Sequence, residues 1–275
     1  MVDASGVELR LARPPRRIVS LLPSVTETLC ALGLADALVG VTAYCVEPRA
    51  LVRDTSRVGG TKDPDLARIR GLAPDLVVAN MEENERAHVE ALREWSIPVW
   101  VTYPRAVSEG IRMIRDLGEI TGTSARAASI AGELEAVLAG VSAASARRPP
   151  LSIFYAIWRD PYMTINAGTY IHDVLAVCGG RNVFADRPDR YPAVTLDEVA
   201  AQRPEVILLP DEPYRFRRAH LEDFAPFRDV PAVRDGRVHL VDGKLCSWYG
   251  PRIAEALSAV PALLAGPGVS APAGA

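Results

Sequence analysis

The sequence predicts an α/β fold of two similar lobes with mostly parallel sheets, a long rigid interlobe helix and a ligand cleft between the lobes. Short β-branched runs alternate with helical patterns, which is typical of stacked β-α units. The order helix, proline, acid, buried strand occurs twice, at 66–78 and 197–208. A long helical pattern at 108–146 separates the two halves.

In the first half we expect strands at 17–22, 37–42, 76–79 and 99–102, and helices at 24–33, 65–71 and 84–95. Ser24 and Glu27 have the spacing of a capping box, so Ser24 is the expected N-cap of its helix. The second half repeats the plan, with strands at 151–156, 206–209 and 238–241 and helices at 170–178 and 251–264.

Between the halves, apolar residues recur at helical spacing from 108 to 122 and from 124 to 146. We expect a long helix with a break at Thr121–Thr123. A helix of about 20 residues spans about 30 Å, which is long enough to join two lobes stiffly. The expected domains are therefore an N-terminal lobe at 1–106, the joining helix at 107–147, a C-terminal lobe at 148–265 and a disordered Gly/Pro/Ala/Ser-rich tail at 266–275.

Composition and charge exclude several classes of protein. The 31 basic and 34 acidic side chains give a net charge of −3, so no nucleic-acid partner is expected. No apolar stretch of about 18 residues is evident, so no membrane insertion is expected either. The start of the chain does not resemble a signal peptide, which predicts a cytoplasmic protein. The four cysteines are far apart and are expected to be small buried hydrophobic residues. The protein is expected to be a monomer and to have no intrinsic cofactor.

The sequence contains no motif of a serine hydrolase, zinc protease, P-loop or dinucleotide-binding enzyme. This absence favours binding over catalysis, so the protein is not expected to be an enzyme. Aromatic residues follow the predicted strands, and such side chains suit stacking against a planar macrocycle, although they also suit ordinary packing at the lobe edges. The candidates for ligand binding are Tyr44, Trp158, Tyr162, Tyr191, Trp248 and Tyr249.

Five polar residues have two interpretations each. Arg252, in the first turn of the closing helix, suits an anionic ligand group or a structural ion pair. Ser24 suits an anion at a helix N-terminus or a cap. His172 is a candidate metal ligand or a structural histidine, and the other three histidines are expected to be structural. Asp65 and Asp197 stand at matching helix starts, where a carboxylate suits partner docking or simple helix stabilisation.

Four segments together resemble one family: 17–27, 74–77, 171–184 and 251–253. They are similar to the helical-backbone metal-receptor proteins, the substrate-binding components of ABC importers for cobalamin, haem and ferric siderophores. The resemblance extends from Arg17 to about Leu264. The opening motif and the loop from Tyr44 to Pro48 are most similar to the members that bind cobalamin.

The resemblance implies a ligand held by aromatic side chains between two lobes with little hinge motion. Tyr44 matches a ligand-contacting tyrosine, Tyr191 stands where a tryptophan is found, and Tyr162 or Met163 stands where a phenylalanine is found. Asp197 matches an acidic residue that docks on the permease. The sequence departs from the family at Ala67, for which Asp65 is the nearest acidic substitute, and at Thr61 and Asn80, which replace tryptophans.

The leading hypothesis is a non-enzymatic binding protein that delivers a corrinoid or related metal chelate to an ABC importer. The resemblance implies a periplasmic or cell-surface location if the protein is exported. A haem- or ferric-siderophore-binding protein is one alternative. Others are a cytoplasmic carrier or modifying enzyme for such a cofactor and a ligand-free interaction module.

Overall fold

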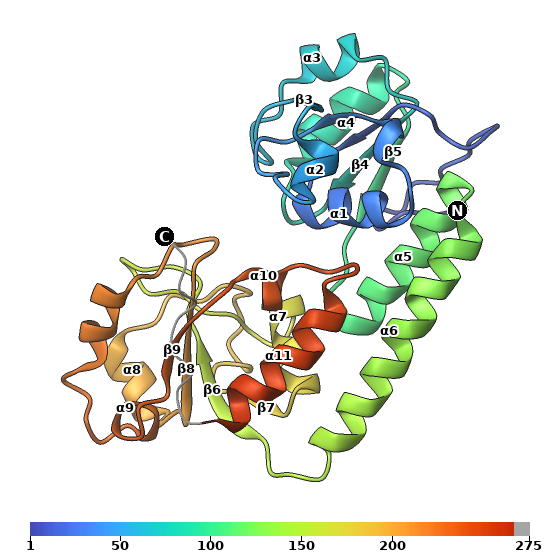
Figure 1. Ribbon diagram of the computed structural model, residues 1–275. Helices are drawn as coiled ribbons and strands as arrows, with labels where there is room; N and C mark the ends of the chain where they lie inside the picture. Colours follow the sequence, from blue (N-terminus) through green and yellow to red (C-terminus); the bar gives the residue numbers. More distant parts are fainter. Residues whose placement is uncertain (267–275) are drawn as a thin grey trace. The chain divides into compact units, whose positions relative to one another are not determined.

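The computed structural model describes residues 1–266 in two compact units, each built on one all-parallel sheet (Figure 1). Unit 1 consists of Met1–Pro104, Ser108–Leu134 and Tyr249–Pro251, and unit 2 consists of Arg105–Val107, Glu135–Trp248 and the chain from Arg252 onward. The expected α/β class with parallel sheets is confirmed. The expected disordered tail lies outside the described residues, apart from Gly266.

The sheet of unit 1 has the strand order β3-β2-β1-β4-β5. Its strands are β1 (Ile18–Ser20), β2 (Leu38–Val41), β3 (Ser56–Arg57), β4 (Leu76–Asn80) and β5 (Val99–Thr102). Its helices are α1 (Pro23–Ala31), η1 (Ala35–Ala37), α2 (Arg49–Val52), α3 (Leu66–Gly71) and α4 (Arg86–Glu94). The central strands β1 and β4 are wholly buried, because helices cover both faces of a parallel sheet.

Two consecutive helices follow β5: α5 (Val107–Thr121) and α6 (Ser124–Ser145). The predicted break between them is confirmed, and Gly122 takes a φ of 73° there, a conformation that favours glycine. Unit 1 includes α6 up to Leu134, and unit 2 includes it from Glu135.

Helix α6 corrects one expectation, because by length and composition alone it is long and apolar enough to cross a membrane. The apolar character comes largely from alanines, and Glu133 and Glu135 lie near its middle. Charged side chains are costly at the centre of a bilayer, so length and composition are weak evidence for a span here.

The sheet of unit 2 has the strand order β7-β6-β8-β9. Its strands are β6 (Leu151–Tyr155), β7 (Gly180–Asn182), β8 (Val206–Pro210) and β9 (Val238–Val241). Its helices are α7 (Tyr170–Val177), α8 (Leu196–Ala201), η2 (Arg218–Phe224), α9 (Pro231–Arg234), α10 (Lys244–Ser247) and α11 (Ile253–Ala265).

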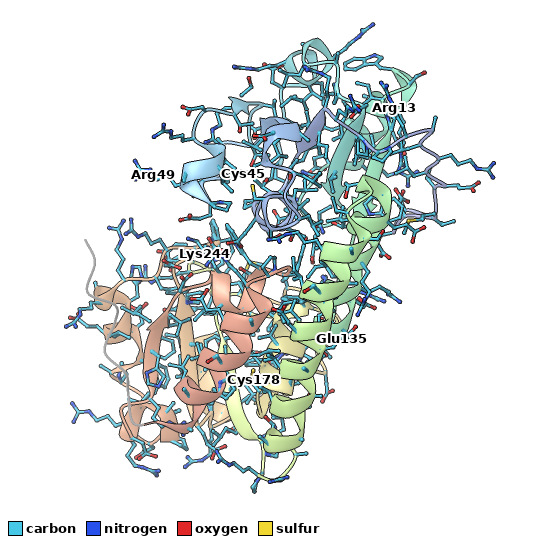
Figure 2. The ribbon with its side chains drawn as sticks, turned by 45° about the vertical axis from the view of Figure 1, so that its right-hand side comes forward. Arg13, Cys45, Arg49, Glu135, Cys178 and Lys244 are labelled. Atoms are coloured by element: carbon cyan, nitrogen blue, oxygen red, sulfur yellow. The ribbon has the colours of Figure 1, made fainter. Side chains whose placement is uncertain are left out.

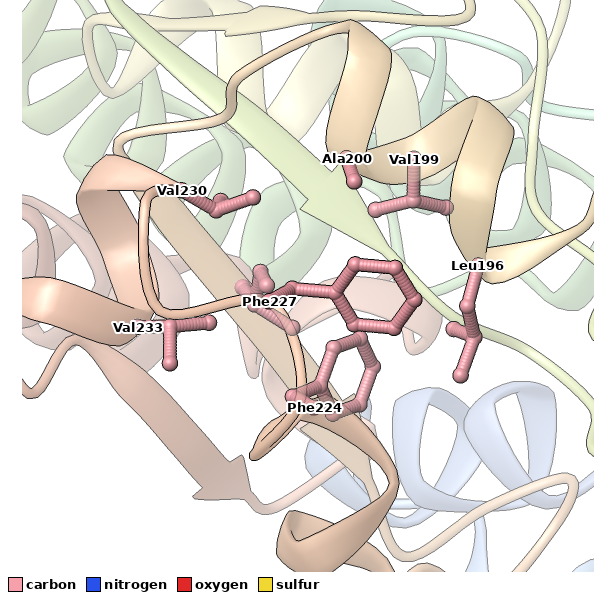
Figure 3. Close-up of a pocket in the computed structure, with 8 residues that line it drawn as sticks. Leu196, Val199, Ala200, Phe224, Phe227, Val230 and Val233 are labelled. Carbon is pink, nitrogen blue, oxygen red and sulfur yellow. The ribbon is translucent and has the colours of Figure 1, made fainter.

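An apolar pocket lies beneath α8 in unit 2, where the rings of Phe224 and Phe227 face Leu196 and Val199 (Figure 3). It leaves no space that a water molecule can occupy. This region is therefore a closely packed core and not a ligand cavity.

The predicted repeat is present in both units as α3–β4 and α8–β8. Each helix is followed by a residue with positive φ, Ala73 at 45° and Arg203 at 48°, and then by a proline. The next residue, Asp75 or Glu205, accepts hydrogen bonds from the amino end of the neighbouring strand. Asp75 accepts the backbone N–H of Arg17 at 2.8 Å, and Glu205 accepts that of Ser152 at 2.8 Å.

The predicted start of α1 is wrong. The helix begins at Pro23 with Leu22 as its N-cap and has no side-chain cap, so Ser24 lies inside the first turn and forms no capping box. Proline is well suited to this position because its missing N–H would be unpaired there anyway. The capping box of this chain forms instead at Thr195 and Glu198, at the start of α8.

Candidate functional site

The carboxyl ends of the parallel strands form one edge of each sheet, and ligands of open α/β sheets bind outside that edge. In unit 1, Tyr44 follows β2 there and keeps 63% of its surface exposed. Its neighbour Cys45 is buried and lies 3.1 Å from the Thr26 hydroxyl and 3.0 Å from the Thr42 hydroxyl. Arg57 also donates to the Cys45 carbonyl at 2.7 Å. The loop is thus fixed from inside, and Tyr44 is presented to solvent.

Figure 2 shows Cys45 within this unit and the Arg49 side chain extending away from α2. Burial raises the pKa of the Cys45 thiol, although hydrogen bonds from Thr26 and Thr42 oppose the shift. A thiol in this state is protonated near neutral pH and serves as a packing group, not as a nucleophile. All four cysteines are buried and free, which confirms their expected role.

A buried polar network closes the end of β4. The side-chain amide of Asn80 donates to the Tyr249 hydroxyl at 2.7 Å and to the Thr102 carbonyl at 3.1 Å. Asn84 accepts the backbone N–H of Asn80 at 2.8 Å. Burial raises the pKa of Tyr249, with a smaller opposing effect from its hydrogen bond with Ser24. The predicted ligand residues Ser24 and Tyr249 are therefore together, but in a network already satisfied within unit 1.

The segment Tyr249–Pro251 approaches α1 closely. Gly250 has a φ of 91°, and a Cβ atom at this position would lie 2.2 Å from the Thr28 hydroxyl oxygen. Only glycine fits there without displacement. Tyr249 is 7% exposed as a result and offers little surface to a ligand.

In unit 2, Trp158 follows β6 and keeps 44% of its surface exposed. It belongs to a tight hairpin, in which Met163 donates its N–H to the Trp158 carbonyl at 3.1 Å and Ile157 donates to the Met163 carbonyl at 2.8 Å. Met163 is half-buried. Trp158 and Met163 thus lie together in one hairpin, and their ligand-binding role stays a prediction.

Tyr162, in the same hairpin, points into the core of unit 2 and is 8% exposed. Its hydroxyl donates to Asp223 at 2.7 Å, and Arg159 pairs with the same carboxylate at 2.7 Å. The Arg159 guanidinium holds the pKa of Asp223 below its usual range, and burial raises that of Tyr162. Tyr162 therefore packs and hydrogen-bonds within unit 2, which is the role that ordinary packing predicts for an aromatic residue at this position.

Sequence reasoning missed the aromatic residues of the loop after β8. The Tyr214 ring meets that of Trp158 edge-on at 5.4 Å and that of Phe216 at 4.9 Å. Phe216 in turn stacks on Tyr162 at 6.1 Å. The alternation of aromatic and basic residues from 214 to 218 is the signal that would have found this loop.

Trp248 lies at the end of α10 with its indole N–H donated to Glu212 at 2.7 Å. Lys244 and Arg252 lie over its ring at 5.5 and 5.1 Å, and Arg252 also pairs with Glu255 at 3.3 Å. Burial raises the pKa of Glu212, against the opposing hydrogen bond from Trp248. Trp248 and Arg252 are brought together, but the indole is 7% exposed and already has partners.

Tyr191 is half-buried, and the Arg190 guanidinium lies 5.7 Å from its ring. Its segment lies against the hairpin of Trp158 and Met163, because Ala193 forms a bridge with Met163. The Nδ1 atom of His172 is buried without a hydrogen-bond partner, and burial lowers the pKa of this histidine. Residues 1–266 contain no group of three His, Cys, Asp or Glu residues able to hold a metal ion. A metal-binding role of His172 stays a prediction.

The two docking candidates stand at helix starts, as expected. Asp65 is the N-cap of α3 and accepts the N–H of Arg68 at 2.9 Å. Asp197 lies in the first turn of α8, next to the capping residue Glu198. Both positions suit helix stabilisation, and their docking role stays a prediction.

Residues 18–245 match the model of the periplasmic binding protein family, which is a family of substrate-binding proteins. The chain belongs to this family. It is 30% identical over 195 residues to the vitamin B12-binding protein of Photorhabdus laumondii subsp. laumondii, covering 71% of this chain and 70% of that protein. It is 29% identical to the vitamin B12-binding protein of Vibrio cholerae, over 90% of this chain and 88% of that one. The resemblance found in the sequence is confirmed.

Solved structures of the family share the fold. The periplasmic vitamin B12 binding protein BtuF of Vibrio cholerae superposes with a TM-score of 0.81 at 25% identity, over 91% of this chain and 97% of BtuF. The periplasmic heme-binding protein BhuT, in complex with two hemes, superposes with a TM-score of 0.81 at 23% identity, over 91% of this chain and 98% of BhuT.

Proposed function

We propose that this protein binds a corrinoid or a related planar metal chelate and delivers it to an ABC importer. Membership of the periplasmic binding protein family and the named vitamin B12-binding relatives support the class of ligand. The observation that carries the proposal is an exposed aromatic side chain at the carboxyl end of a strand in each unit, Tyr44 after β2 and Trp158 after β6.

The shape of both side chains and the order of their loops suit a flat ligand. Tyr and Trp present a large apolar face with a polar edge, which suits a macrocycle with polar substituents. The Tyr44 loop is fixed by its buried neighbour Cys45, and Trp158 is fixed by the hairpin to Met163. Because these loops are already ordered, little conformational entropy is lost when a ligand binds.

The protein binds its ligand without chemical turnover. Burial raises the pKa of Cys30 to about 11 and that of Cys178 to about 12, so neither thiol is a nucleophile at neutral pH. His172, whose Nδ1 is unpartnered, belongs to no group of three metal-ligating side chains among residues 1–266. In this proposal His172 would supply a single nitrogen ligand to a metal that the chelate already holds.

The protein acts outside the cytoplasm as a monomer, as expected of a binding protein of an importer. Asp65 and Asp197 dock on basic residues of the permease. Asp65 is exposed and uses one carboxylate oxygen, Oδ1, for the cap of α3, which leaves the other for a partner.

Calorimetric titration with cobalamin, cobinamide, haem and a ferric siderophore tests the proposal and identifies the chelate. We expect one class to bind, and Tyr44→Ala and Trp158→Ala each to weaken its binding roughly tenfold, because a lost aromatic contact is worth about 1 kcal/mol. Trp95→Ala is the matched control, since Trp95 is exposed at the end of α4, where it contacts Arg70. Absence of binding to any chelate, or conversion of the ligand, contradicts the proposal.

A further inference from the structure

The loop that follows β8 carries three exposed arginines, Arg215, Arg217 and Arg218. We call residues 214–218 the arginine loop. Among the residues that the structure describes, none of the three takes part in an ion pair. Uncompensated like charges repel one another, so this surface favours the approach of an anion.

Phe216 fixes the direction of the arginine loop. Its buried ring stacks on Tyr162, and its backbone N–H donates to the Pro210 carbonyl at 3.1 Å. Arg215 and Arg217 precede and follow this buried residue in the chain, and both side chains are exposed to solvent.

The arginine loop lies beside the exposed indole of Trp158, because Tyr214 contacts that ring edge-on at 5.4 Å. The strands that precede them, β6 and β8, are adjacent and parallel, with Phe154 opposite Ile207. One edge of the unit 2 sheet therefore combines an aromatic face with two guanidinium groups. Such a surface fits a flat ring with anionic groups on its rim.

A nearby arginine, Arg159, differs from those of the arginine loop because it forms ion pairs. Arg159, next to Trp158 in sequence, pairs with Asp223 at 2.7 Å and with Asp160 at 2.9 Å. Its charge is neutralised in place, so it supports the hairpin. Next to Trp158, the exposed arginines that form no ion pair belong to the arginine loop.

We propose that Arg215 and Arg217 select chelates that carry a carboxylate or phosphodiester on the rim of the ring that packs on Trp158. This inference rests on the proposed function and specifies its ligand class. A guanidinium forms two parallel hydrogen bonds to either anion, and these bonds are stronger than neutral ones.

The test compares Arg215→Gln/Arg217→Gln with the control pair Arg181→Gln/Arg228→Gln. The control residues are exposed arginines of unit 2 outside this edge, and both pairs remove two charges. The ligands are haem with its dimethyl ester, and cobalamin with cobinamide, which lacks the nucleotide phosphodiester. The haem pair reports carboxylate recognition, and the corrinoid pair reports phosphodiester recognition.

We expect the loop variant to lose roughly tenfold or more in affinity for the member of one pair that carries the anionic group, and to bind the counterpart without this group as the wild type does. Wild-type affinity for the anionic member falls with added salt, and this dependence is smaller in the loop variant. Arg215→Lys/Arg217→Lys keeps the charge without the planar fork, so it retains the salt dependence with intermediate affinity. Circular dichroism verifies that each variant is folded.

Three results overturn the inference and leave the proposed function intact: unchanged affinity in the loop variant, an equal loss for the ligand without the anionic group, or an equal loss in the control pair. If the wild type binds none of the four ligands, the proposed function fails and the inference fails with it.

Discussion

In both units the same hydrogen-bonding pattern holds the amino end of a central strand, but the carboxyl ends of the strands have different surroundings. At the amino end, Asp75 of unit 1 and Glu205 of unit 2 each follow a helix, a positive-φ residue and a proline. Each carboxylate accepts hydrogen bonds from the adjacent strand. The backbone N–H groups of the same two residues donate to that strand, to the Arg17 carbonyl at 2.9 Å and to the Ser152 carbonyl at 2.8 Å.

At the carboxyl end the similarity is lost. Strand β4 ends at Asn80, which is buried and hydrogen-bonded to Tyr249 and Thr102. Strand β8 ends at Pro210, and the chain continues into the exposed arginine loop. The amino ends therefore share one hydrogen-bonding pattern. The carboxyl ends of the two equivalent strands differ, because β4 ends in a buried polar network and β8 leads into an exposed loop with aromatic and basic residues.

Phe216→Ala removes the ring that anchors the carboxyl end in unit 2, and it has the largest expected effect. We expect a loss of about 3 to 5 kcal/mol in the free energy of unfolding, as for other buried phenylalanines. Denaturant unfolding followed by fluorescence measures it. Val46→Ala, at an exposed position, is the control and is expected to change stability by less than about 0.5 kcal/mol. A similar small change for Phe216→Ala would show that the ring does not anchor the loop.

Gly250→Ala tests the closed end of unit 1. Its backbone needs a positive φ, and the new Cβ would meet Thr28, so we expect a loss of about 2 to 4 kcal/mol. Gly33→Ala is a matched control, because Gly33 has a φ of 85° but no atom within 4 Å of the added Cβ. The control isolates the backbone strain, about 1 kcal/mol. Equal losses at both positions would contradict the close approach to α1.

Asp75→Ala and Glu205→Ala test the shared amino ends. Each removes a carboxylate that accepts backbone N–H groups, and we expect both to cost about 1 to 3 kcal/mol. Thermal unfolding of the two variants measures the loss, with Glu222→Ala as an exposed acidic control. A large loss for one and none for the other would refute the equivalence of the two units.

Tyr249→Phe separates a structural role from a ligand-binding one. Loss of the hydroxyl removes one partner of Asn80, whose amide keeps Thr102, so we expect a loss of about 1 kcal/mol in stability. Chelate affinity stays at the wild-type value. Tyr44→Phe, at an exposed position, leaves stability unchanged. A stable Tyr249→Phe variant with weakened binding would place this tyrosine at the ligand instead.

The smallest expected effect is on the pH dependence of stability, and it involves unit 2. His239 is buried in β9, and burial lowers its pKa from the usual value of 6.5. The unfolded chain therefore takes up the proton first, and stability falls as the pH drops below about 6.5. We expect His239→Gln to reduce this dependence between pH 7 and pH 5, measured as the change in the free energy of unfolding. Parallel pH profiles for the wild type and the variant would rule out His239 as the source.

The sequence was sufficient to predict the strands that carry continuous apolar runs. Strands β4 and β8 are buried along their whole length, so hydrophobicity alone identifies them. The short strands β3 and β7 were missed, because Ser56–Arg57 and Gly180–Asn182 contain no apolar run. Their conformation is set by pairing with β2 and β6, which depends on contacts that a local pattern does not contain.

The sequence predicted where the candidate site residues lie along the strands better than it predicted their burial and their hydrogen-bond partners. An aromatic residue after a strand lies at the carboxyl edge, as Tyr44 and Trp158 do. Whether it stays exposed depends on distant partners: Tyr162 bonds to Asp223, 61 residues away, and Tyr249 bonds to Asn80, 169 residues away. No spacing rule gives such pairings, so the burial of these two tyrosines could not be foreseen.

The return of residues 249–251 to unit 1 has a consequence for synthesis on the ribosome. Strand β4 and helix α1 leave the exit tunnel first, but the hydroxyl that Asn80 contacts is translated 169 residues after Asn80, together with the glycine beside Thr28. The first unit therefore completes its folding only after residues 249–251 have emerged. A fragment truncated after Leu134 would expose the Asn80 amide and the Thr28 side of α1, which makes it a ready substrate for proteases.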